Sequence, residues 1–188
     1  YNGDKSFLHS AIKWANYLIN EVNFHDLGSS LCIKYFSGKK SPAVPNNTTM
    51  VLWFLNYLFS LTKIEKYNSY NSKLIKFLLD YQKPSGELPY SVSTNESRGK
   101  SCYICYQYNA FEMIDLLHLS KLYHNDDISK IIKNQIHFLK GAFYGKGHVK
   151  FDCNNYTPVV NYYVSTLISA FFLARNYGYI IDINFLKK

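Results

Sequence analysis

Six helical stretches of alternating character run through the sequence, and this alternation limits the fold more than any other feature. In each stretch apolar side chains recur every three to four residues, which is the period of an α-helix. The first, third and fifth are amphipathic and carry much of the lysine, whereas the second, fourth and sixth are apolar over most of their length. A helix that is apolar nearly all round needs other helices to cover it. We therefore predict an all-α fold in two layers, with the amphipathic helices outside. The expected helices are about residues 6–23, 48–63, 69–82, 104–123, 126–142 and 158–177.

The loops between these helices indicate an internal repeat. Gly86 and Tyr90 follow one expected helix, and Gly147 and Phe151 follow another at the same spacing. A less regular copy precedes them. We therefore predict a single domain over residues 1–188, made of three antiparallel helical hairpins whose extended loops lie on one face and end in an aromatic side chain. The three repeats are about residues 6–63, 69–123 and 126–177.

The segment from Leu78 to Ser91 contains a glutamine, a glycine and then Pro89-Tyr90, and it resembles the repeat signature of α/α-toroid proteins. This group includes six-hairpin glycosidases, uronic-acid epimerases and lyases, and prenyltransferase and terpene-cyclase relatives. The chain looks most like members associated with polysaccharide biosynthesis or processing. The resemblance implies a protein that acts on or binds a carbohydrate. A complete toroid has six hairpins, so three would form half of one: a fragment of a longer toroid, or a half that pairs with a second half or a second copy.

Two further segments extend the resemblance towards both ends of the chain. Pro45-Asn46-Asn47-Thr48 is similar to a helix start of the family, and the segment from Lys150 to Tyr162 is similar to one of its later loops. The chain departs from the family where inner-helix histidines are expected, because Tyr106 and Tyr162 stand there. Glu112 matches the acidic position of the same helix. The loss of both imidazoles leaves open whether the chain is an enzyme.

Three carboxylates are the candidates for catalysis. If the chain is an enzyme, the resemblance implies a glycoside hydrolase, lyase or epimerase-like activity, with Glu112 as acid or base and Glu87 or Asp152 as its partner. Glycoside hydrolysis, for example, needs two carboxyl groups that flank the bond. The alternative for Glu112 is a buried residue paired with a lysine or a tyrosine hydroxyl, and for Glu87 it is an exposed turn residue. Asp115 is expected to pair with a nearby lysine or histidine.

Tyrosine and asparagine side chains gather in the loops and at the first turns of the inner helices. Tyrosine rings stack on the apolar faces of sugars, and amides and phenols match their hydroxyl groups. The alternative for any single tyrosine is packing between helices. The predicted sugar-binding residues are Tyr35, Asn47, Tyr90, Tyr106, Tyr108, Asn109, Asn155 and Tyr162.

The four cysteines fall in the same three loops. Cys102 and Cys105 form a C-x-x-C pair, a spacing found in zinc sites, but the sequence contains no second close pair. Reduced, partly buried thiols are the main interpretation, and a zinc site of four thiolates is the alternative. That site would consist of Cys32, Cys102, Cys105 and Cys153. The sequence predicts no other cofactor.

The formal net charge of +8 comes almost entirely from lysine, because only two of the 21 basic residues are arginine. Base readout and bidentate phosphate contacts depend on arginine, so nucleic-acid binding is not expected. No apolar run reaches the roughly 20 residues of a membrane span. No signal peptide is recognisable, and the N-x-S/T sequons are weak support for secretion, so a cytoplasmic location is favoured.

Two functions of other classes stay open beside the carbohydrate interpretation. Half a toroid buries its apolar seam only against another unit, which favours a non-catalytic module for interaction or self-association. The aromatic content, 18% of the chain, also fits an isoprenoid-binding toroid relative. Asp126-Asp127 is the nearest approach to the acidic cluster of that group, and it is better interpreted as a helix cap.

Overall fold

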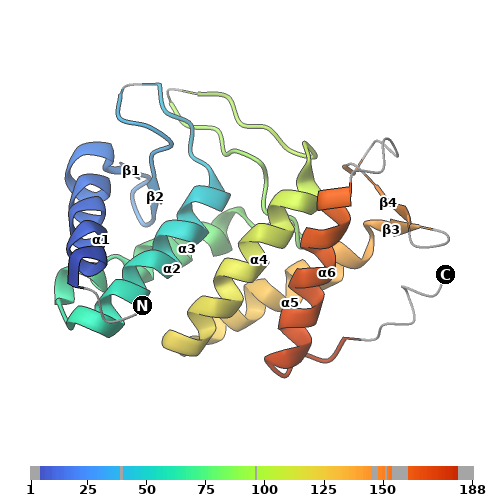
Figure 1. Cartoon of the computed structure of the whole chain (residues 1–188). Coiled ribbons are helices and arrows are strands. Elements are labelled where there is room, and N and C mark those ends of the chain that lie inside the picture. Colours follow the sequence, from blue (N-terminus) through green and yellow to red (C-terminus); the bar gives the residue numbers. More distant parts are fainter. Residues whose placement is uncertain are drawn as a thin grey trace.

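The computed structural model describes residues 5–38, 40–95, 97–144, 148–150, 152–153 and 161–181. Within these ranges the chain is mostly helical, as predicted, with two short antiparallel pairs of strands that the sequence did not reveal (Figure 1). The helices are α1 (Lys5–Tyr17), α2 (Pro45–Thr62), α3 (Asn71–Tyr81), α4 (Cys105–Leu122), α5 (Asp126–Lys140) and α6 (Asn161–Asn176). A π-helical turn (Leu18–Val22) extends α1, and a 3-10 turn (Glu65–Tyr67) follows α2. The strands are β1 (Phe24–Asp26), β2 (Leu31–Ile33), β3 (Phe143–Tyr144) and β4 (His148–Val149), paired β1 with β2 and β3 with β4.

The helices form two layers, and α4 lies at the centre of one of them. It packs against α2 on one side, against α6 on the other and against α5 behind, while α3 packs against α5. Figure 1 shows α2, α4 and α6 side by side in front of α3 and α5. The front row is therefore made of the apolar helices and the second layer of amphipathic ones, such as α5, which buries one face. The buried apolar side chains of α5 are Ile128, Ile131, Ile132, Ile136, Phe138 and Leu139.

Local signals explain where the helices begin. The Asn125 side chain caps α5, because its Oδ1 accepts hydrogen bonds from the backbone N–H groups of Asp127 (2.9 Å) and Ile128 (3.1 Å). The prediction that the Asp126-Asp127 pair caps this helix is therefore wrong: the cap is Asn125, and both aspartates occupy the first turn, where negative charge is favoured. In α2, Pro45 takes the first position, three residues before the expected start. The expected start of α6, residues 158–160, lies outside the described residues.

Two clusters of buried apolar side chains form the core. The larger one joins α3, α4, α5 and α6, and the smaller one joins α1 to α2 through residues such as Ala15, Ile19 and Leu55. A buried pair of amides connects α2 to α3. Asn56 donates to Asn71 Oδ1 and Asn71 donates to Asn56 Oδ1, each at 2.8 Å, so both buried side chains have partners.

The long connecting segments lie at the end of the front row where α2, α4 and α6 begin (Figure 1). Backbone pairing joins the first two of them, because Val92 N–H donates to Ala43 C=O at 2.8 Å, and the second segment folds back on itself where Ser91 pairs with Lys100. This end of the molecule therefore brings together residues from segments far apart in the sequence. Among the described helices, none has both the length and the apolar character needed to cross a bilayer.

Candidate functional site

Tyrosines from three separate segments meet at the end of the front row where its helices begin. The ring of Tyr90 contacts Tyr103 (4.9 Å between centroids) and Tyr108 (5.0 Å), both edge to face. At the start of α6, the rings of Tyr162 and Tyr163 lie 4.6 Å apart. We call the group the tyrosine cluster. Its members are Tyr35, Tyr90, Tyr103, Tyr108, Tyr162 and Tyr163.

The electrostatics of two phenols show that these segments are neighbours. Burial, followed by the nearby phenols of Tyr90, Tyr35 and Tyr162, raises the pKa of Tyr108 to about 12. Burial also raises the pKa of Tyr163, with added contributions from Tyr162 and Tyr103. Side chains from the segment after β2, the segment before α4, α4 itself and α6 therefore lie close to one another in one site.

Part of the tyrosine cluster is open to solvent. Tyr35 and Tyr162 are each 55% exposed and Tyr103 is 43% exposed, whereas Tyr90 and Tyr108 are half-buried. A half-buried ring is held in place by its neighbours, and an exposed ring still offers a face to a ligand. Four of the predicted sugar-binding residues, namely Tyr35, Tyr90, Tyr108 and Tyr162, are thus brought together.

Two other predicted sugar-binding residues serve the fold instead. Tyr106 is 6% exposed and stacks on Phe138 of α5 at 5.0 Å, which is the helix-packing alternative for a tyrosine. Asn109 is fully buried: its Oδ1 accepts from Leu88 N–H (2.8 Å), and its Nδ2 donates to the carbonyls of Leu88 and Cys105 (2.9 Å each). Asn109 therefore fixes the backbone two residues before Tyr90.

The last two predicted sugar-binding residues are not among the members of the tyrosine cluster. Asn47 is half-buried in the first turn of α2. Asn155 lies outside the described residues.

Glu112 is buried between the two layers. It is 1% exposed and accepts a hydrogen bond from Gln135 Nε2 of α5 at 3.3 Å. Burial, followed by the charges of Asp115 and Glu87, raises the pKa of Glu112 well above its ordinary value. Folding therefore favours the protonated form of this carboxyl. Its partner is an amide, where the sequence suggested a lysine or a tyrosine hydroxyl.

Glu87 is also buried, at 2% exposure, so the alternative of an exposed turn residue is wrong. Its Oε2 lies 2.9 Å from Lys83 Nζ, and its Oε1 accepts a hydrogen bond from Cys102 N–H at 2.9 Å. The third candidate carboxylate, Asp152, is 4% exposed, in the segment that follows β4. All three candidates are thus more deeply buried than the tyrosine cluster.

Asp115 does not have the partner that the sequence predicted. It accepts a hydrogen bond from Thr49 Oγ1 of α2 at 3.1 Å, and in the described part of the chain it forms no ion pair with a lysine or histidine. Burial raises its pKa to about 6, although the bond from Thr49 lowers it. Its role is to connect α4 to α2.

Three of the four cysteines lie together. Cys105 Sγ and Cys153 Sγ are 2.7 Å apart, and Cys102 Sγ lies 3.8 Å from Glu87 Oε2. Cys32 is elsewhere: its thiol is buried 3.2 Å from Thr48 Oγ1, and burial raises its pKa to about 12. The fourth polar group beside the three thiols is thus Glu87 rather than Cys32.

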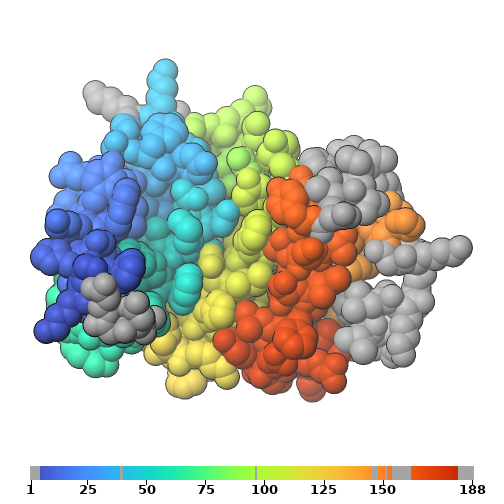
Figure 2. All heavy atoms as spheres, viewed as in Figure 1, coloured from blue at the N-terminus to red at the C-terminus, as the bar shows by residue number. Residues whose placement is uncertain are grey.

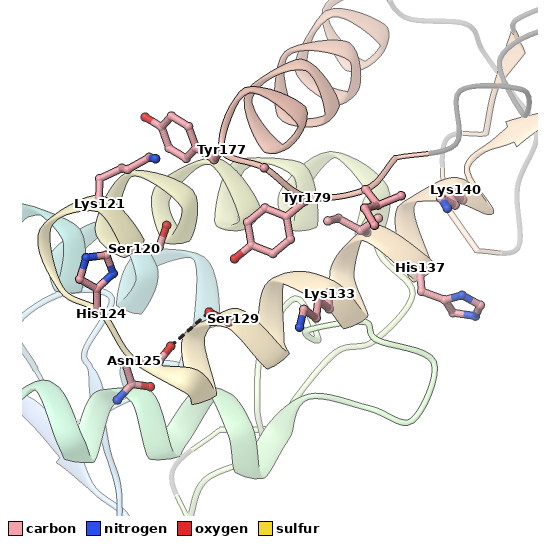
Figure 3. A pocket seen from close by; sticks show the side chains of 13 residues that line it. Ser120, Lys121, His124, Asn125, Ser129, Lys133, His137, Lys140, Tyr177 and Tyr179 are labelled. Atoms are coloured by element: carbon pink, nitrogen blue, oxygen red, sulfur yellow. Dashed lines mark hydrogen bonds between the residues drawn. The ribbon is translucent and has the colours of Figure 1, made fainter.

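A cavity of about 670 Å³ lies at the C-terminal ends of α4 and α6 and along α5 (Figure 3). Its lining is basic and includes no carboxylate, and Lys121 Nζ lies 4.4 Å from the centre of the Tyr177 ring. The sequence prediction missed this cavity, although Lys133, His137 and Lys140 recur at helical spacing on α5. The other polar lining residues are Ser120, His124, Asn125, Ser129 and Tyr179.

Comparison with known protein families and with curated proteins finds no match to this chain.

Proposed function

We propose that the chain is a carbohydrate-binding domain of α/α-toroid type, made of three helical hairpins, that takes a polysaccharide or its precursor at the tyrosine cluster. The observation that carries the proposal is that six tyrosines from separate segments meet there with three of their rings exposed. A tyrosine ring covers the apolar face of a sugar while its hydroxyl bonds to the sugar hydroxyls. Several such rings at different angles suit a chain of sugars better than a single small ligand.

Binding is favoured over hydrolysis because the candidate carboxylates are engaged inside the protein. Glu112 is bonded to Gln135, and Glu87 to Lys83 and the Cys102 backbone. Both are almost fully buried. Glycoside hydrolysis requires two carboxyl groups on either side of the bond that breaks, and neither group is free to take that position here.

The basic cavity of Figure 3 is a less suitable site for a neutral sugar. Its lysines and histidines favour an anion, and Tyr177 is already covered by Lys121. The two sites lie at different ends of the helices, so substitutions in one leave the other intact.

Binding to a panel of neutral and acidic polysaccharides, followed by calorimetry, tests the proposal. Replacing both Tyr35 and Tyr162 by alanine is expected to weaken affinity about tenfold or more, since each stacked ring contributes on the order of 1 kcal/mol. Tyr57→Ala on α2 is the matched control, because Tyr57 is an exposed tyrosine outside the cluster. His137→Ala serves the same purpose for the basic cavity. Absence of binding to every polysaccharide, or equal affinity in the cluster variant, would contradict the proposal.

A second candidate function is self-association, and the exposed surface of the front row favours it. Large apolar side chains on α2, α4 and α6 are 38% to 65% exposed. In the view of Figure 2, atoms of all three helices form the visible surface. Two copies that cover these side chains would give six hairpins, the number in a complete toroid. The residues are Met50, Tyr57, Leu61, Phe111, Leu122, Ile168 and Phe172.

A further inference from the structure

Three thiols and a carboxylate meet where the segment after α3, the start of α4 and the residues after β4 come together. The ligand atoms of Glu87, Cys102 and Cys153 all lie within 4.8 Å of one another. Cys105 joins them through Cys153, at 2.7 Å between the sulfurs. The chain turns sharply at the C-x-x-C pair, because φ is positive both at Cys102 (54°) and at Ile104 (44°).

The chemistry of the four groups matches the ligands of zinc. Structural zinc sites are tetrahedral, with Zn–S distances of about 2.3 Å and Zn–O distances of about 2.0–2.2 Å, which places neighbouring ligand atoms about 3.5–3.8 Å apart. The 3.8 Å between Cys102 Sγ and Glu87 Oε2 agrees with this spacing. To complete a tetrahedral site, the sulfurs of Cys105 and Cys153 would separate by about 1 Å, and Cys105 would move towards the group formed by Glu87, Cys102 and Cys153.

One positive charge already lies beside these groups, because Lys83 Nζ is 2.9 Å from Glu87 Oε2. A divalent cation among the three sulfurs would be ligated by thiolates and by the Glu87 carboxylate, and ligation would displace the thiol protons.

Cys105 is the first residue of α4, where the helix dipole favours a negatively charged ligand. Its sulfur also accepts a hydrogen bond from the backbone N–H of Cys153 at 3.1 Å.

We propose that Cys102, Cys105, Cys153 and Glu87 bind one Zn²⁺ ion in a closed, structural site. Four protein ligands leave no open position for a substrate, so the ion joins segments rather than performing chemistry. It fastens the loop after α3 and the residues after β4 to the start of α4. The proposal is independent of carbohydrate binding, and its tests measure metal alone.

The test compares two cysteine variants of the full chain, purified under reducing conditions and supplied with Zn²⁺. Wild type and Cys32→Ser are expected to hold about one equivalent of zinc by mass spectrometry, and Cys153→Ser less than about a tenth. Cys32 is the matched control because it is a buried thiol outside the group. Substitution by Co²⁺ is expected to give the intense visible bands of tetrahedral thiolate coordination in wild type and Cys32→Ser only.

Glu87→Gln tests the fourth ligand. It also provides a second test of metal binding if Cys153→Ser does not fold. The amide oxygen retains the hydrogen bond from Cys102 N–H, so the fold is kept while the anionic ligand is lost. A weaker Co²⁺ affinity by about tenfold and a changed spectrum are expected. Less than a tenth of an equivalent of zinc in wild type, or an equal loss in Cys32→Ser, overturns the proposal. The proposal is also overturned if Cys105 and Cys153 form a disulfide and the protein takes up no metal after that disulfide is reduced. A Co²⁺ spectrum that is unchanged in Glu87→Gln overturns the four-ligand assignment.

Discussion

Two carboxyl groups lie three residues apart on α4, Glu112 buried and Asp115 half-buried, and each accepts a hydrogen bond from an uncharged side chain. Glu112 faces Gln135 of α5 and Asp115 faces Thr49 of α2. Both carry raised pKa values because burial penalises their ionised forms. These groups lower the stability of the folded state at neutral pH, and this cost should be measurable.

Asp115→Asn is predicted to stabilise the protein above pH 6 and to leave it unchanged near pH 4. The pKa of Asp115 rises from its ordinary 3.8 to about 6 on folding. Between these values the unfolded chain loses the proton first, so the free energy of unfolding falls as pH increases, and above pH 6 the full cost persists. We expect a gain of about 1 to 3 kcal/mol at pH 7, measured by urea denaturation from pH 4 to 8.

Asp80→Asn is the control for this pH dependence. Asp80 forms a surface ion pair with Lys76 at 2.8 Å, and its loss should change stability by less than about 1 kcal/mol. An Asp115→Asn variant whose stability follows that of wild type at every pH would show that the carboxyl is not penalised by folding.

At the scale of elements, the segment after α3 is held against α5 by a close backbone approach. Gln82 Nε2 donates to Ile131 C=O of α5 at 3.0 Å and to Gly86 C=O at 3.1 Å, and Asn134 donates back to Gln82 Oε1 at 2.9 Å. Gly86 then passes so near α5 that a Cβ would lie 2.1 Å from the carbonyl oxygen of Asn134. This contact positions Glu87 and Tyr90 relative to α4.

Gly86→Ala is therefore predicted to destabilise the protein by more than about 3 kcal/mol, through a backbone clash and a left-handed conformation. Gly28→Ala separates the two effects, because Gly28 has a similar φ of 84°, against 92° at Gly86, but nothing within 4 Å of its Cβ. We expect it to cost only about 1 to 2 kcal/mol in thermal or urea unfolding. Equal losses in the two variants would contradict the close approach to α5.

At the scale of the whole molecule, the front row is covered on one side only. The second layer packs behind it, while α2, α4 and α6 keep large apolar side chains exposed (Figures 1 and 2). Exposed large apolar side chains, where they gather into a patch, mark an interface.

Sedimentation at micromolar concentration is predicted to show a dimer of the chain. Phe172→Glu is expected to shift it towards monomer, because Phe172 on α6 is the most exposed of these side chains and burying a charge opposes association. Trp14→Glu on α1 is the control, since Trp14 is similarly exposed but lies on a helix outside the α2, α4 and α6 row. A wild-type chain that stays monomeric across this range would contradict self-association.

Tyr106 and Tyr108 show what a sequence pattern leaves undecided. They lie two residues apart on α4, and both were predicted to bind sugar. In the structure Tyr106 packs on α5, while Tyr108 joins the tyrosine cluster, because two residues turn a helix by roughly 200°. The orientation of α4 between its neighbours decides which of the two faces a ligand.

By itself the sequence determined the six helices, their alternation between apolar and amphipathic, and the segments in which tyrosines and cysteines collect. These properties are local, since they follow from a period of 3.6 residues and from caps and prolines within one turn. Only the tertiary structure decided that Glu87 is buried beside the thiols and that Cys32 lies apart from the other three cysteines. It also decided that basic side chains line a cavity at the C-terminal ends of α4 and α6. Those outcomes depend on the paths of loops between helices, and contacts between distant segments are set by packing of the whole chain rather than by any local pattern.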